Sequence, residues 1–315
     1  MPAIPMSLTE RNIIHAIRYF AFFNYAPTGD EIYCFLKTRA LKWHFTGILD
    51  SMVKKGAVTI KCYGKENCFP SPFSTIPNAP SRYTLPEYSI QIKNQKSKIK
   101  NSALKINKIK HYIDLLSLFP QIKLVGLSGT VAMMDADEDD DIDLFIITAG
   151  NRLFTGRFFA LTLAQFFNLR RKRITDHQLR IKAKNKVCLN LFFDESDMLI
   201  PKRKRTEYVA HEVLQMKPVA VKSDVYDRFL KANGWVFNIF PNARIISSIK
   251  YKVSINKVNT KYFILNTFAD WIEILLQKLQ LHFIRKHQTK ELITPTQLWF
   301  HPEDFGEKMN YTSFQ

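Results

Sequence analysis

The stretch that decides the fold lies at residues 122–148 and reads IKLVGLSGTVAMMDADEDDDIDLFIIT. The apolar run at 122–127 predicts a buried strand, and the Ser-Gly-Thr at 128–130 predicts a turn that leads into a short helix. Seven of the nine residues at 135–143 are acidic. The apolar residues at 144–148 predict a second buried strand. The sequence therefore predicts two strands, with a glycine turn and a dense group of carboxylates between them.

The second strand is expected to present two carboxylates on one face. Side chains alternate along a strand, so Asp141 and Asp143 project together while Ile142 and Leu144 enter the core. A glycine turn at a helix start, here at Gly129, leaves backbone N–H groups available for phosphate oxygens. Two carboxylates beside such a turn are typical of a site for Mg²⁺ (or Mn²⁺) carried by a triphosphate.

These residues match a known family. Gly129-Thr130, ten intervening residues and then Asp141-Ile-Asp143 closely resemble the nucleotidyltransferase signature of the DNA polymerase β superfamily. The resemblance covers roughly residues 120–195. It implies a polymerase-β-like core of the α/β (α+β) class with a small mixed sheet. It also implies transfer of a nucleoside monophosphate from an NTP by Mg-dependent in-line attack on the α-phosphate.

The same resemblance implies the roles of individual residues. Asp141 and Asp143 would be the catalytic metal ligands, and Ser128, Gly129 and Thr130 would bind the phosphates of the nucleotide. The acceptor is not specified by the motif, so a protein side chain, a small-molecule hydroxyl and an RNA end all remain open.

One position departs from the family pattern. The family has a third carboxylate on a later strand, and the matching strand here, residues 186–193, carries Asn190 instead. Asn190 can contact a nucleotide or a metal through its carbonyl, but it takes no proton at pH 7. Asp194 would lie about 13 Å further along an extended strand. Two hypotheses follow: a working nucleotidyltransferase, or a non-catalytic DNA-binding regulator that senses a nucleotide through a degenerate transferase domain.

The acidic run also permits simpler interpretations. It could be a solvated acidic loop, or a loop that binds Ca²⁺. An EF-hand loop requires glycine at its sixth position and glutamate at its twelfth, where this chain has Asp140 and Ile146. The pattern therefore argues against an EF-hand.

The first part of the chain resembles a winged helix-turn-helix. Capping boxes at Ser7–Glu10 and Thr28–Glu31 predict the starts of two helices. A third helix is expected at 39–55, ended by Gly56. Alternating residues at 57–63 and 67–69 predict a hairpin. Duplex DNA binding is one reading of this module, and protein docking or packing on the neighbouring domain is another.

Four parts of the chain are expected. They are a winged-helix-like domain at 1–80, a basic helical connector at 81–119, the nucleotidyltransferase core at 120–200 and a helical C-terminal region at 201–315. Basic clusters at 170–173 and 202–205 could guide a nucleic acid, RNA or DNA, or could form an ordinary solvated surface. In the C-terminal region, His211 and Lys217 are possible phosphate contacts.

Composition sets the remaining expectations. A chain of 315 residues with 46% hydrophobic and 13% aromatic residues predicts an ordered globular protein. Its net charge of +18 favours a polyanionic partner. The N-terminus shows no signal-peptide pattern and the four cysteines form no CxxC pair, so we expect a cytoplasmic protein with no membrane partner. Cys62 and Cys68 flank a predicted turn and could form a disulfide, but scattered reduced thiols are the favoured interpretation.

Overall fold

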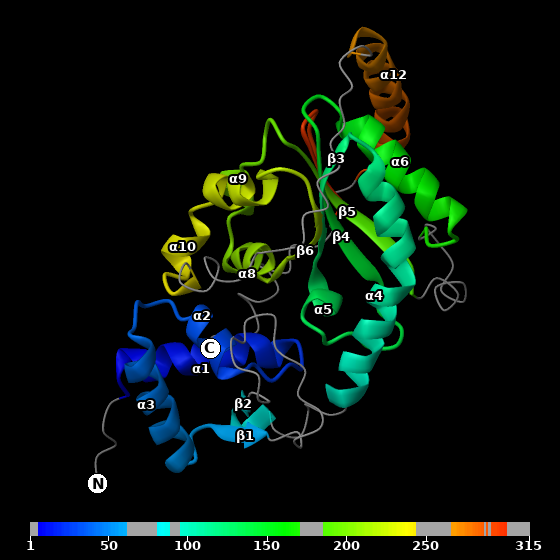
Figure 1. The fold of residues 1–315 in the computed structure, drawn as a ribbon. Helices are drawn as coiled ribbons and strands as arrows, with labels where there is room; N and C mark the ends of the chain where they lie inside the picture. Colours follow the sequence, from blue (N-terminus) through cyan, green and yellow to red (C-terminus); the bar gives the residue numbers. More distant parts are fainter. Residues whose placement is uncertain are drawn as a thin grey trace.

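The computed structural model describes residues 6–61, 81–88, 95–170, 185–243, 266–286, 288 and 291–300. Within these ranges the protein is a mixed α/β structure with ten α-helices, a six-stranded mixed sheet and a two-stranded sheet (Figure 1). The predicted α/β class is therefore confirmed.

The six-stranded sheet forms the centre of the larger part of the molecule. Its strands are β3 (Ile122–Leu127), β4 (Ile142–Thr148), β5 (Val187–Asp194), β6 (Lys217–Val221), β7 (Leu292–Ile293) and β8 (Gln297–Trp299). They lie in the order β6-β3-β4-β5-β8-β7. The β4–β5 pair is parallel and the other pairs are antiparallel. The parallel pair spans a crossover that includes α6, as a parallel connection requires.

Helices cover both faces of this sheet. The helices are α4 (Gln95–Leu118), α5 (Gly129–Ala132), α6 (Leu153–Phe166), α8 (Glu207–Gln215), α9 (Val225–Ala232), α10 (Val236–Ile239) and α12 (Asn266–Arg285), with 3₁₀ turns at Pro86–Tyr88 and Lys202–Lys204. Leu144 and Ile146 of β4 pack in a cluster with α4 and α6, while Phe145 and Ile147 pack with α8 and α9. The strand thus alternates between two buried faces.

The N-terminal part contains α1 (Leu8–Phe22), α2 (Gly29–Cys34), α3 (Lys42–Lys54), β1 (Thr59–Lys61) and β2 (Arg82–Thr84). Both predicted capping boxes are present, with reciprocal bonds between Ser7 and Glu10 and between Thr28 and Glu31. Gly56 follows α3 with φ +73°, as a C-terminal glycine does.

Strand β1 pairs in an antiparallel manner with β2, so that Ile60 lies opposite Tyr83. The strand that we predicted at 67–69 lies outside the described residues, as do Cys62 and Cys68. Two other cysteines, Cys34 and Cys188, are buried and form no disulfide.

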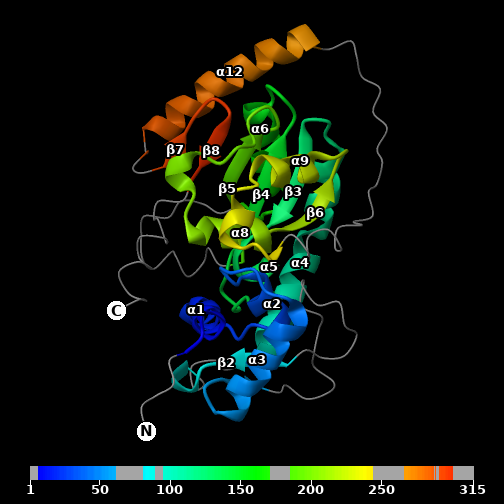
Figure 2. The same ribbon diagram turned by 90° about the vertical axis from the view of Figure 1, so that its left-hand side faces the viewer.

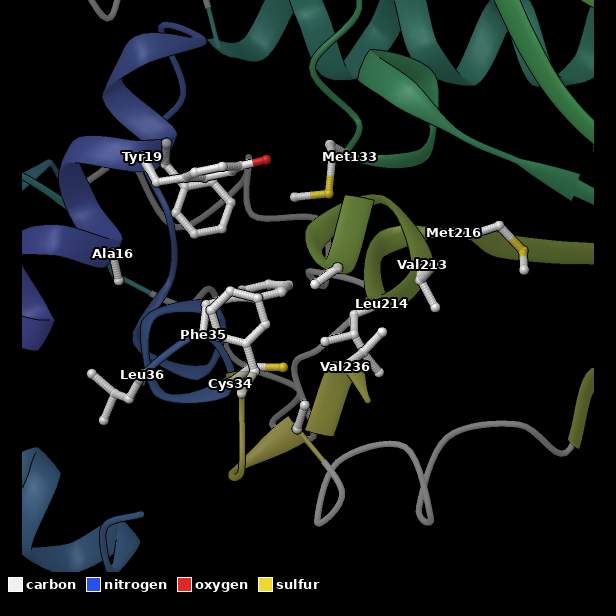
Figure 3. Packing of buried hydrophobic residues seen from close by; sticks show 14 of the residues in the cluster. Ala16, Tyr19, Cys34, Phe35, Leu36, Met133, Val213, Leu214, Met216 and Val236 are labelled. Atoms are coloured by element: carbon white, nitrogen blue, oxygen red, sulfur yellow. The ribbon is translucent and has the colours of Figure 1, made fainter. Parts of the chain in front are cut away.

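The N-terminal helices pack directly on α8 (Figures 2 and 3). His211 of α8 stacks between the rings of Tyr19 and Phe35, with centroid distances of 3.5 and 4.1 Å. At the edge of this contact, Lys37 forms a 2.7 Å ion pair with Glu207. One buried cluster therefore joins the two parts of the molecule.

The described part of the region after residue 200 contains α8, α9, α10 and α12, but it also holds three strands that the prediction of a helical region did not include. It supplies β6 at one edge of the central sheet and β7 and β8 at the other. These strands have between two and five residues each. Segments this short carry too little periodicity to be recognised, and they are held by their neighbours in the sheet.

Across the described part of the chain, no helix combines the length and the apolar character needed to cross a bilayer.

Candidate functional site

The turn between β3 and α5 requires a glycine at position 129. Gly129 has φ +62°, a left-handed conformation that other residues rarely adopt. A methyl group on Gly129 would also place its carbon 2.8 Å from Oδ2 of Asp143. The backbone N–H of Ser128 donates a 3.1 Å hydrogen bond to the carbonyl oxygen of Asp143. The turn and the second aspartate of the predicted motif are therefore in direct contact.

Asp143 also contacts the neighbouring strand. The Asn190 side chain donates from Nδ2 to Oδ1 of Asp143 at 2.9 Å, and the Asn190 Oδ1 accepts a 2.8 Å bond from Cys188 Sγ. Asp143 and Asn190 are both partly exposed, so a ligand from solvent can reach them. The structure thus brings Gly129, Asp143 and Asn190 together.

Asp141 directly precedes β4 and is partly exposed. Its Oδ1 accepts a 3.0 Å hydrogen bond from the backbone N–H of Lys186, at the start of β5. The backbone N–H of Ile142 in turn donates to the carbonyl of Lys186 at 2.8 Å. These bonds anchor Asp141 at the same end of the sheet as Asp143.

Asn190 sits at an irregularity of β5. Leu144 lies opposite Leu189, while the next residue, Phe145, lies opposite Leu191, so Asn190 is an extra residue without a β4 partner. Such bulges are common beside functional sites, where they redirect a side chain. Here the bulge accompanies the contact between Asn190 and Asp143.

Asp194 does not complete the site. It lies opposite Thr148, at the far end of the parallel pair from Asp143. Its Oδ1 accepts hydrogen bonds from the backbone N–H and the hydroxyl of Ser196 at 2.9 and 2.6 Å.

Another carboxylate near Asp143, that of Glu212, comes from α8, and the sequence pattern did not reveal this contact. Burial and the negative charge of Asp143 raise the pKa of Glu212 to about 7, while a hydrogen bond from the Gly129 backbone N–H lowers it. Glu212 therefore lies beside both halves of the predicted motif. No local signal could identify it, because 82 residues separate it from Gly129 in the sequence.

Most of the acidic run has a structural role. Lys98 of α4 forms a 3.1 Å ion pair with the buried Asp135. The ammonium of Lys105, also buried, donates to the carbonyl oxygens of Glu138 and Asp140 at 2.9 and 2.7 Å and to the side chain of Asn185. The Lys105 ammonium thus binds backbone carbonyl oxygens of the kind that would coordinate the ion in a Ca²⁺-binding loop. This arrangement also explains why a basic helix lies beside the acidic run.

Thr130 and Ser128 are both partly exposed at the turn. The Thr130 hydroxyl donates a 2.8 Å hydrogen bond to Oδ2 of Asp140, which also accepts from the backbone N–H of Asp137 at 3.0 Å. Ser128 is the residue before α5, and its side chain makes no capping bond to that helix.

The prediction that His211 could contact phosphate is wrong. Its ring is 1% exposed and is enclosed by aromatic rings of the N-terminal helices. Burial lowers the pKa of His211 well below 6.5, and the charges of His15 and Lys37 lower it further, so the ring is neutral at pH 7. Lys217 begins β6 opposite Leu127 and is partly buried.

The described residues of the two predicted basic clusters differ in their exposure to solvent and in their contacts. Arg170, Lys202 and Arg203 are exposed, and residues 171–173 lie outside the described ranges. Arg205 instead donates to the carbonyl of Ile200 at 2.8 Å.

The donor set at the site fits a hard divalent cation that a ligand helps to hold. Within the described ranges, no three His, Cys, Asp or Glu side chains come close enough to hold a metal ion by themselves. Mg²⁺ ordinarily uses one or two carboxylates together with substrate phosphates, and not a cage made by the protein alone. Asp141 and Asp143 supply such a pair. Burial raises the pKa of Glu212, and the negative charge of Asp143 raises it further; a cation beside Asp143 would offset this second effect.

Comparisons of the chain with protein-family models, with curated proteins and with solved structures found no match. Its function has to be inferred from the residues of the site.

Proposed function

We propose that this protein is a nucleotidyltransferase, which transfers a nucleoside monophosphate from an NTP to an acceptor. One observation carries the proposal. Thirteen residues, which include the rest of α5, separate Gly129 from Asp143 in the sequence, yet a methyl group on Gly129 would lie 2.8 Å from the Asp143 carboxylate. A turn for phosphates and a carboxylate for a cation therefore face one another, as a bound metal–triphosphate needs.

Asp141 and Asp143 would hold Mg²⁺ or Mn²⁺. When bound, the ion would neutralise charge on the phosphates and favour ionisation of the attacking hydroxyl. The residues around it would position the nucleotide. Gly129 would let the phosphates approach the backbone closely, and Asn190 would orient Asp143 through its 2.9 Å hydrogen bond.

Glu212 is our candidate for the third carboxylate of the site. The family motif places that group on the later strand, where this chain has Asn190. Glu212 would bring the negative charge to the same place from α8, beside Asp143 and Gly129. In this proposal the ionised form of Glu212 supplies the negative charge that Asn190 lacks.

The test is incubation of the full chain with each of the four NTPs labelled at the α-phosphate. Mg²⁺ or Mn²⁺ would be present, with cellular RNA or protein extract as acceptor. Transfer of label by the wild type, and its loss in Asp141→Asn and Asp143→Asn, would support the proposal. Asp139→Asn is the matched control, because Asp139 is an exposed aspartate of the same run. Transfer that survives in both site variants would rule the proposal out.

The neutral Asn190 favours a second candidate, a DNA-binding regulator that senses a nucleotide without turnover. The N-terminal module, which we interpret as winged-helix-like, presents exposed Arg39, Lys42 and His44 near the start of α3. Salt-dependent binding of duplex DNA, together with metal-dependent NTP binding and no label transfer, would favour the regulator over the enzyme.

A further inference from the structure

Helix α12 turns polar side chains toward the protein. The Glu273 carboxylate accepts hydrogen bonds from the backbone N–H groups of Phe154 and Thr155, at 2.7 and 2.8 Å. Gln280 donates to the carbonyl of Phe154 at 2.7 Å and accepts from Arg157 at 2.6 Å. Each of these bonds joins α12 to the first turns of α6.

These contacts set the rotation of α12 about its own axis. Arg152, the residue before α6, contributes no side-chain capping bond, so Glu273 satisfies N–H groups that the helix itself leaves open. Arg152 instead forms a 2.6 Å ion pair with Asp270 of α12. Rotation of α12 would break these bonds, so the face that it turns to solvent is a defined feature of the fold.

That solvent-facing side is apolar. Five large apolar side chains form an outer stripe: Trp271 (60% exposed), Ile274 (50%), Leu275 (41%), Leu279 (49%) and Phe283 (66%). Their spacing places them on one side of the helix. In a surface helix such a stripe ordinarily faces the core, and here it faces outward.

Basic side chains alternate with the outer stripe. Lys278, His282, Arg285 and Lys286, with Leu281, line a hollow of about 510 Å³ on the same helix. Asp270 and Glu273 are the acids of α12, and both are engaged with α6 or the residue before it. The exposed face therefore combines apolar side chains with basic ones.

We propose that α12 docks on the surface of an anionic lipid bilayer, where it lies in the plane of the interface. Apolar side chains would enter the acyl boundary, while lysine and arginine would reach the lipid phosphates. Helix α12 lies along the end of the molecule opposite α1–α3 (Figure 2). This proposal replaces the sequence-based expectation that no membrane is a partner.

Charge favours a lipid surface over a second copy of the chain as the occupant. Pairing two outer stripes would bring Lys278, Arg285 and Lys286 of one copy toward the same cations of the other, and like charges oppose such pairing. An anionic bilayer uses the apolar and the basic side chains together. The proposal does not depend on the nucleotidyltransferase assignment.

The experiment is flotation of the full chain with vesicles of phosphatidylcholine alone and with vesicles that also contain phosphatidylserine. We expect binding to the anionic vesicles, weaker binding at high salt and little binding to the neutral ones. Leu275→Ser/Leu279→Ser and Lys278→Glu/Arg285→Glu should each lower the partition coefficient at least roughly tenfold. Leu104→Ser is the matched control, because Leu104 is 58% exposed on α4, away from the outer stripe.

Thermal unfolding of each variant would show that the fold is retained. Three results would overturn the proposal. The first is failure of the wild type to float with anionic vesicles, and the second is binding of both double variants equal to that of the wild type. The third is a dimer of the wild type in solution that Leu275→Ser/Leu279→Ser dissociates, which would identify a second copy as the occupant.

Discussion

Gly129 is the residue on which the candidate site depends most directly. Its positive φ and its closeness to Asp143 each exclude a side chain, for separate reasons. The positive φ is a property of the backbone, and the closeness to Asp143 is a property of the site. The Asn190 contact acts on the same carboxylate from the neighbouring strand. The Gly129 turn and the Asn190 amide therefore both constrain the position of Asp143.

Gly129→Ala is expected to lower stability by about 1–2 kcal/mol, because alanine is strained at this φ. It should also weaken metal-dependent NTP binding at least tenfold, since the added carbon must displace the Asp143 carboxylate. Denaturant unfolding and calorimetric titration would measure the two effects. Gly47→Ala in α3 meets nothing within 4 Å and should leave NTP binding unchanged. Undiminished NTP binding by Gly129→Ala would contradict the proposed arrangement.

At the scale of elements, α8 links the candidate site to the rest of the molecule. Consecutive residues of this helix have different surroundings. His211 packs among the rings of the N-terminal helices, and Glu212 lies beside Gly129 and Asp143. A shift of α8 would therefore change both contacts.

Glu212→Gln tests the role of α8 in the site. The pKa of Glu212 is about 7 in the folded protein and near 4.5 as an isolated group. The folded state thus binds this proton more tightly, and stability falls as pH rises from about 4.5 to 7. Glutamine lacks this charge, so the variant should be more stable than the wild type at pH 8, by on the order of 1–3 kcal/mol.

The same variant should bind metal–NTP several-fold more weakly, because it removes negative charge from the site. Glu138→Gln, an exposed glutamate of the acidic run, is the matched control and should change neither quantity. A loss of stability at pH 8 in Glu212→Gln would mean that burial and Asp143 do not destabilise the ionised Glu212 carboxylate.

Elements with local signals could be predicted from the sequence, and those held by distant neighbours could not. The helix starts at Ser7 and Thr28 and the β3-turn-β4 order depend on adjacent residues, and they agree with the structure. Strands β6, β7 and β8 are too short for a pattern. The Glu212 contact and the role of Lys105 arise only when distant segments meet in three dimensions.

For the molecule as a whole, one aromatic cluster joins the N-terminal helices to the α/β part. Its centre is a neutral histidine whose Nδ1 is buried without a hydrogen-bond partner among the described residues. Protonation of His211 would place a charge among apolar rings, which is strongly unfavourable. The contact between the two parts should therefore weaken in acid.

The pKa of His211 is lowered well below 6.5 in the folded protein, so the unfolded chain takes up this proton first as pH falls. Its contribution to stability is present above pH 6.5 and is lost progressively below it. We expect His211→Phe to reduce the difference in unfolding free energy between pH 7.5 and 5.5 by about 1 kcal/mol. His111→Phe, at an exposed position of α4, should leave that difference unchanged. An unchanged pH dependence in His211→Phe would contradict this assignment.

The most direct test of the central claim is calorimetric titration of the full chain with each NTP, with and without Mg²⁺. The claim is that the Gly129 turn and the aspartates 141 and 143 form one metal–nucleotide site. It predicts NTP binding that requires Mg²⁺, is weakened at least tenfold in Asp143→Asn and is retained in Asp139→Asn. Absence of Mg²⁺-dependent binding for all four NTPs, or equal binding by Asp143→Asn and the wild type, would contradict it.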